Sequence, residues 1–131
     1  MAAAPPVCNL TANVLRGLKP EPVWALFETL ASIPRPSKHE THVLAWLRAF
    51  AEARSLPWAQ DAMGNLVIRK VGQAGGAGAP TVVIQGHVDM VCEKNNDVQH
   101  DFDRDGIKLV VDGDWVKARH NTIHKHHNTQ A

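Results

Sequence analysis

His87 and Asp89 are the residues whose types and spacing point most directly to chemistry. They follow the β-branched run T-V-V-I at residues 81–84, which predicts a buried strand that ends near Gln85. Side chains two residues apart in an extended backbone point the same way, so the imidazole and the carboxylate should project together. Such a pair suits a metal ligand with its orienting group, or a general base with its orienting group.

The tripeptide His-x-Asp is weak evidence by itself, because eight histidines in 131 residues allow it to arise by chance. A histidine at the end of a strand can also simply cap a turn. Its position favours a functional role, since ligands bind at the strand ends of α/β sheets. On spacing alone, both interpretations stay open.

Two helices are predicted to precede this strand. The first covers residues 20–33, where apolar side chains recur at helical spacing and a Pro-Arg-Pro sequence follows. The second begins with a capping box formed by Ser37 and Glu40, and its apolar positions continue to about Arg54.

Two hairpins are predicted as well. The first joins strands at residues 58–60 and 66–71, and the second joins 107–111 to 115–118 through an Asp-Gly turn. A glycine-rich loop at 72–80 lacks the ending of a phosphate-binding loop. Together these elements predict an α/β fold, with two helices followed by a mixed sheet centred on the 81–85 strand.

Composition excludes several classes of protein. A chain of 131 residues fits one domain, and a net charge of +1 predicts no nucleic-acid partner. No apolar run approaches the length of a membrane span, and the N-terminus has no secretory signal. The only cysteines, Cys8 and Cys92, form no disulfide framework and fit the reducing cytoplasm.

Several separated motifs follow one another between residues 18 and 119. They are W-A-L-F-E-T-L-A-S-I-P-R-P-S (24–37), D-A-M-G-N-L-V-I-R-K (61–70), V-V-I-Q-G-H-V-D-M-V (82–91), K-N-N-D (94–97), H-D-F (100–102) and D-G-D-W-V-K-A-R (112–119). In this order they resemble the M20 family of metallopeptidases, and within it the aminoacyl-histidine dipeptidases, also called Xaa-His dipeptidases.

The resemblance implies an α/β catalytic domain that holds two divalent ions, usually zinc, with manganese or cobalt as alternatives. The position of His87 is that of a metal ligand, and Asp89 matches the aspartate that orients this imidazole without binding metal itself. Metal-activated water would then attack the peptide bond of a dipeptide substrate. A cytoplasmic enzyme with a second, smaller domain, homodimeric at full length, is expected.

The sequence departs from this family after Arg119. The bridging-aspartate segment G-A-D-N-G and the Glu-Glu pair of the family are missing. We therefore expect an N-terminal fragment with a loose leader at 1–19, a partial catalytic domain at 20–119 and a disordered, His-rich tail at 120–131. One ligand cannot hold a catalytic zinc, so we expect the fragment alone to be inactive and to bind no metal specifically.

Two other functions stay open. The chain could be a non-catalytic binding or regulatory fragment that pairs with a full-length subunit. It could instead bind metal through its tail, where four histidines gather. These are His120, His124, His126 and His127. In each case an incompletely covered sheet would make the isolated chain poorly soluble.

Overall fold

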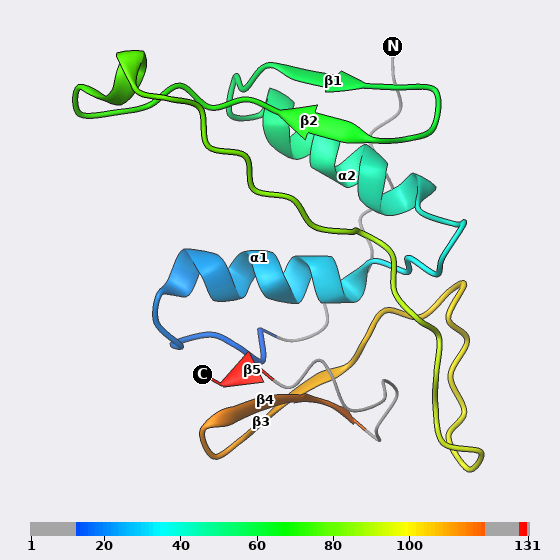
Figure 1. The fold of residues 1–131 in the computed structure, drawn as a ribbon. Helices are drawn as coiled ribbons and strands as arrows, with labels where there is room; N and C mark the ends of the chain where they lie inside the picture. The colour runs from blue at the N-terminus through cyan, green and yellow to red at the C-terminus, as the bar shows by residue number, and fades with distance from the viewer. Residues whose placement is uncertain (1–12, 120–128, 131) are drawn as a thin grey trace.

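The computed structural model describes residues 13–119 and the backbone of residues 129–130. Two helices are stacked between two small antiparallel sheets, so that β1 and β2 lie on the side of α2, and β3 and β4 on the side of α1 (Figure 1). The elements are α1 (Glu21–Ser32), α2 (Thr41–Glu52), β1 (Trp58–Gln60), β2 (Leu66–Ile68), η1 (Gly76–Gly78), β3 (Leu109–Asp112), β4 (Trp115–Ala118) and β5 (Thr129–Gln130).

The first helix forms where the sequence predicts it. Pro20 is the N-cap residue, and Pro22 lies in the first turn, where a missing backbone N–H costs no hydrogen bond. The helix ends at Ser32, and the N–H of Ile33 donates to the carbonyl of Leu30. The prolines that follow cannot continue it.

The core lies between α1 and the β3–β4 hairpin. Leu15, Trp24 and Val116 are each at most 6% exposed and form one apolar cluster. The indole N–H of Trp24 donates to the carbonyl of Lys19, which satisfies its polar edge. Leu15 belongs to the stretch predicted as a loose leader, and it is buried in this cluster. Residues 1–12 lie outside the described part of the chain.

Both predicted hairpins are present, although β2 ends at Ile68 instead of residue 71 and β3 covers 109–112 instead of 107–111. β1 pairs with β2 in antiparallel register, and the carboxylate of Asp61 accepts the backbone N–H groups of Met63 and Asn65 in the turn between them. β3 pairs with β4 in the same sense, and Gly113 adopts a φ of 59° in the connecting turn. These turns depend on neighbouring residues, which is why the sequence predicts them well.

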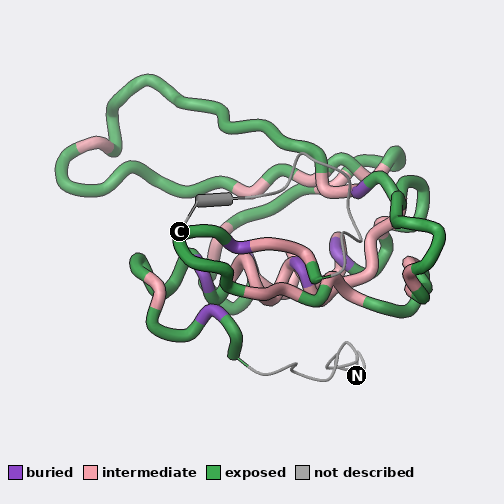
Figure 2. The backbone as a smooth tube through the Cα atoms, turned by 90° about the horizontal axis from the view of Figure 1, so that it is seen from below, coloured by how far each residue is buried: buried purple, intermediate pink, exposed green. Residues whose placement is uncertain are grey.

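The predicted central strand at Thr81–Gln85 is not a strand in this structure. Val82, Val83 and Ile84 are 82%, 82% and 95% exposed. Residues 71–86 project from the rest of the chain and are exposed along almost their whole length (Figure 2). A β-branched run becomes a buried strand only when other strands pair with its edges, and no strand among the described residues does so.

The sheets therefore differ from the predicted single mixed sheet. The α/β class and the order of two helices before the strands are as predicted, but the strands form two separate antiparallel sheets. Among the residues that the structure describes, parallel pairing is limited to one isolated bridge, between Pro36 and Met90.

The predicted disordered tail is only partly covered by the structure. Residues 120–128 and 131 lie outside the described part of the chain, and with them the four tail histidines. Residues 129–130 form β5, which pairs with β4. Within the described ranges, no helix has both the length and the apolar character that a membrane span requires.

Two substitutions separate the core from the exposed segment. Leu15→Ala should lower the free energy of unfolding by about 2–5 kcal/mol, because it leaves a cavity beside Trp24. Ile84→Ala should change it by no more than about 0.5 kcal/mol, because the side chain already contacts water. Urea unfolding followed by tryptophan fluorescence measures both. Equal losses in the two variants would show that the 81–85 segment is buried after all.

The exposed segment should also control aggregation. A Val82→Lys, Ile84→Lys double variant should remain soluble at higher concentrations than the unmodified chain, because charge blocks pairing between unpaired β-branched segments. Light scattering against concentration measures this. The control is a Val23→Lys, Met63→Lys double variant, which adds the same charge at two exposed apolar side chains outside residues 71–86. An equal gain in solubility in both variants would show that net charge, and not residues 82–84, controls aggregation.

Candidate metal-ligand site

The side chains of His87 and Asp89 meet, as their spacing predicts. Nδ1 of His87 lies 2.8 Å from Oδ1 of Asp89 and 3.1 Å from the carbonyl oxygen of the same residue. The backbone at residues 87–89 belongs to no helix or strand. The imidazole is 75% exposed, whereas the carboxylate is 31% exposed. One edge of the ring is therefore held by Asp89, and the ring as a whole is open to solvent.

Ser37 completes this group, although the sequence predicts that it caps the second helix. Its hydroxyl donates to Oδ2 of Asp89 at 2.5 Å, across 52 residues of sequence. The three side chains therefore form one chain of hydrogen bonds, from Ser37 through Asp89 to His87. No local pattern reveals such a contact, because its two partners lie on segments that only the folded chain brings together.

The predicted capping box does not form. α2 begins at Thr41, four residues after Ser37, and its N-cap residue Glu40 makes no side-chain cap bond. The Glu40 carboxylate instead accepts the backbone N–H of Lys38 at 2.7 Å. Residues 36–39 form a tight turn, in which the N–H of His39 donates to the carbonyl of Pro36 and Lys38 has a φ of 74°. This turn leaves the Ser37 hydroxyl available for Asp89.

Backbone pairing brings the two segments together. The N–H of Met90 donates to the carbonyl of Arg35 at 2.9 Å, beside the parallel bridge between Pro36 and Met90. The side chain of Met90 is 6% exposed, which anchors this end of the long loop. The Arg35 guanidinium in turn donates to the carbonyl of Leu30 near the end of α1. The site is thus attached to the first helix through a few buried contacts.

These contacts determine the charge and the proton positions of the pair. The hydrogen bond from Ser37, followed by that from His87, lowers the pKa of the Asp89 carboxyl below its ordinary value. An ionised carboxylate only accepts hydrogen bonds, so the neutral His87 ring must carry its proton on Nδ1. The lone pair of Nε2 is then the one available to a metal ion.

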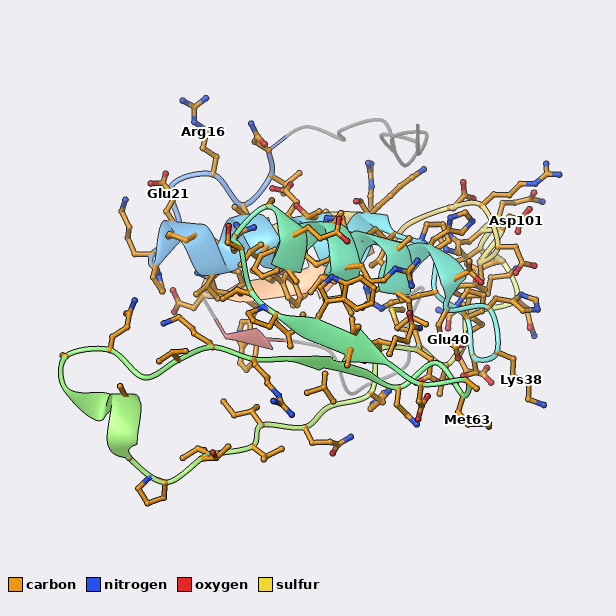
Figure 3. All side chains as sticks on the ribbon, turned by 90° about the horizontal axis from the view of Figure 1, so that it is seen from above. Arg16, Glu21, Lys38, Glu40, Met63 and Asp101 are labelled. Atoms are coloured by element: carbon orange, nitrogen blue, oxygen red, sulfur yellow. The ribbon has the colours of Figure 1, made fainter. Side chains whose placement is uncertain are left out.

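The residues fit one ligand of a metal site but not a whole site. Within residues 13–119, no three histidine, cysteine, aspartate or glutamate side chains are placed to hold an ion together. His39 is paired instead with Asp103, at 3.0 Å from Nδ1 to Oδ1. Figure 3 shows Lys38 and Glu40 at the same end of the molecule as Asp101, from which the Asp103 loop continues.

Comparisons with known proteins agree with the motifs. The cytosol non-specific dipeptidase of Escherichia coli (strain K12) is 42% identical over 109 residues, which cover 83% of this chain and 22% of that protein. The crystal structure of aminoacylhistidine dipeptidase from Vibrio alginolyticus matches with a TM-score of 0.75 and 39% identity, over 79% of this chain and 21% of that one. This chain spans about a fifth of the length of both. No protein-family model matches the sequence.

The state of Asp89 can be tested by titration. Its carboxyl should titrate below the ordinary aspartate pKa of about 3.9, because Ser37 and then His87 stabilise the ionised form. A pKa lowered by folding means that these contacts stabilise the fold above about pH 4, and that this stability is lost as the pH falls through the lowered pKa.

Carbon-13 NMR of the Asp89 carboxyl gives the midpoint directly. Asp89→Asn removes the titrating group, so urea unfolding of this variant should lose the corresponding part of the acid sensitivity. A carboxyl midpoint at or above the ordinary aspartate value would contradict the hydrogen-bonded geometry.

Proposed function

We propose that this chain forms part of a metal-dependent dipeptidase of the M20 family and contributes His87 as a metal ligand, because it is similar over most of its length to two dipeptidases. The observation that carries this proposal is the His87–Asp89 pair, with its 2.8 Å contact, on a chain 42% identical to a dipeptidase. The proposed reaction is hydrolysis of a dipeptide, and Xaa-His dipeptides are the proposed substrates.

Each residue has a distinct role in this proposal. Asp89 holds the Nδ1 proton of His87 and increases the basicity of the ring, but it does not bind metal. His87 presents Nε2 to a divalent ion, for which zinc is proposed first, with manganese or cobalt as alternatives. Such an ion supplies a Lewis acid for hydrolysis of the peptide bond.

The chain by itself is proposed to be inactive. A catalytic zinc takes about three protein ligands, and the residues matched here provide one. The sequence contains neither a G-A-D-N-G segment nor a Glu-Glu pair, which supply further ligands and the general base in the family it resembles. We propose that the other ligands come from outside this sequence. A cytoplasmic location is proposed because the E. coli relative is named as a cytosolic dipeptidase.

A non-catalytic fragment that pairs with a full-length subunit is the second candidate. The exposed valines and isoleucine at residues 82–84 favour it, because an unpaired β-branched segment can add to the edge of another sheet. Metal binding by the His-rich tail is a third candidate, and its histidines lie outside the described residues.

Activity of the chain and of a chimera tests the main proposal. The 131-residue chain should not hydrolyse an Xaa-His dipeptide with zinc, manganese or cobalt. A chimera in which residues 18–119 replace the matching segment of the E. coli relative should hydrolyse it. In the chimera, His87→Ala should lower kcat/KM by about 100-fold or more, because a metal ligand is lost. The control is His42→Ala, an exposed histidine in the first turn of α2.

Three outcomes would contradict parts of this account. Hydrolysis by the 131-residue chain that vanishes in His87→Ala would show that the chain is not inactive alone. Unchanged activity of the His87→Ala chimera would remove the ligand role. Zinc bound by the chain should be lost on deletion of residues 120–131 and should survive His87→Ala. If zinc binding instead survived the deletion and was lost in His87→Ala, the zinc bound by the isolated chain would be at His87.

A further inference from the structure

We propose that Ser37 is a positioning residue for the candidate site, and that its hydroxyl fixes the Asp89 carboxylate that fixes His87. This inference rests on the proposed role of His87 as a metal ligand. Its basis is the 2.5 Å hydrogen bond from Oγ of Ser37 to Oδ2 of Asp89, next to the 2.8 Å contact between Oδ1 and the imidazole.

The carboxylate needs a second partner because one hydrogen bond does not define its plane. The terminal torsion of an aspartate is broad, so a carboxylate held through one oxygen can rotate about the bond to Cβ. Here each oxygen of Asp89 has its own donor: Ser37 on Oδ2 and His87 on Oδ1. Hydrogen bonds to an ionised acceptor are the stronger ones, so the pair holds the plane well.

The imidazole has little else to hold it. Its side chain is 75% exposed, and the residues that precede it, 81–86, are exposed as well. Packing therefore cannot determine the orientation of the ring. The direction of Nε2 follows from the two acceptors of Nδ1, the Asp89 carboxylate at 2.8 Å and the Asp89 carbonyl at 3.1 Å, and Ser37 acts through the first of them.

Ser37 itself is held by the backbone. It lies in the 36–39 turn, directly after Pro36, which forms the bridge to Met90. Asp89 directly precedes Met90, whose N–H donates to the carbonyl of Arg35. The serine and the aspartate therefore lie on two backbone segments that are already paired. The short side chain of Ser37 is long enough to reach the Asp89 carboxylate.

The direction of each hydrogen bond follows from the groups involved. A carboxylate only accepts, so the Ser37 hydroxyl must donate to it, and so must Nδ1 of His87. Nε2 is then without a proton in the neutral ring, which is the form that binds metal. Removing the hydroxyl frees Oδ2, lets the carboxylate rotate, and weakens the preference for a proton on Nδ1.

The test is the tautomer of His87 in the 131-residue chain without metal. Nitrogen-15 NMR of the ring, recorded well above the ordinary histidine pKa of about 6.5, measures the ratio of the Nδ1–H to the Nε2–H form. Ser37→Ala should lower this ratio about fivefold, a change of the size that one hydrogen bond supports. Ser37→Thr, which keeps the hydroxyl, should restore it. Ser55→Ala, an exposed serine in the turn after α2, is the control.

An unchanged ratio in Ser37→Ala would overturn the proposal. The backbone N–H of Met90 reports whether the segments remain paired, through its hydrogen exchange. If Ser37→Ala also speeds hydrogen exchange at the Met90 N–H, the segments have separated and Ser37→Thr decides. A tautomer ratio in Ser37→Thr equal to that of the unmodified chain supports the proposal, and a ratio equal to that of Ser37→Ala overturns it. Because no metal is present, this result is independent of the chimera. If the tautomer ratio did not depend on Ser37, His87 could still be a metal ligand. If the His87→Ala chimera kept its activity, Ser37 could still orient the imidazole through Asp89.

Discussion

The pairing of residues 35–37 with residues 89–90 is the constraint on which the candidate site depends. One backbone hydrogen bond and one parallel bridge join the segment after α1 to the end of the long loop. The cost of closing so long a loop grows only slowly with its length, so a few buried contacts around Met90 can hold it. Ser37 and Asp89 meet because Pro36, which precedes the serine, is already paired with Met90, which follows the aspartate.

Residues 82–84 are an apolar run without partner strands among the described residues. Its β-branched composition is typical of a central strand, yet its side chains face solvent along a segment without a partner strand among the described residues. A strand differs from a helix in this respect, because its hydrogen bonds come from other segments. The matched part of this chain covers only about a fifth of each relative, so the relatives contain segments that have no counterpart here.

Features that depend on contacts between residues close in the sequence were predicted correctly, whereas features that depend on distant contacts were not. α1 and both hairpins are determined by neighbouring residues, such as the Asp61 carboxylate in its turn, and they form as predicted. The His87–Asp89 pair was predictable because residues two apart share a side of any extended backbone. Ser37 was not, because a capping box and a contact 52 residues away compete for the same hydroxyl, and only the fold decides between them.

The central claim is that His87, oriented through Asp89, is one ligand of a dipeptidase metal site. A crystal structure of the zinc-loaded chimera tests it most directly. The account predicts zinc about 2.0–2.1 Å from Nε2 of His87, with Nδ1 still hydrogen-bonded to Asp89 and Oδ2 of Asp89 still accepting from Ser37. Zinc bound by ligands that exclude His87, or bound to its Nδ1 with the Asp89 contact broken, would contradict the account.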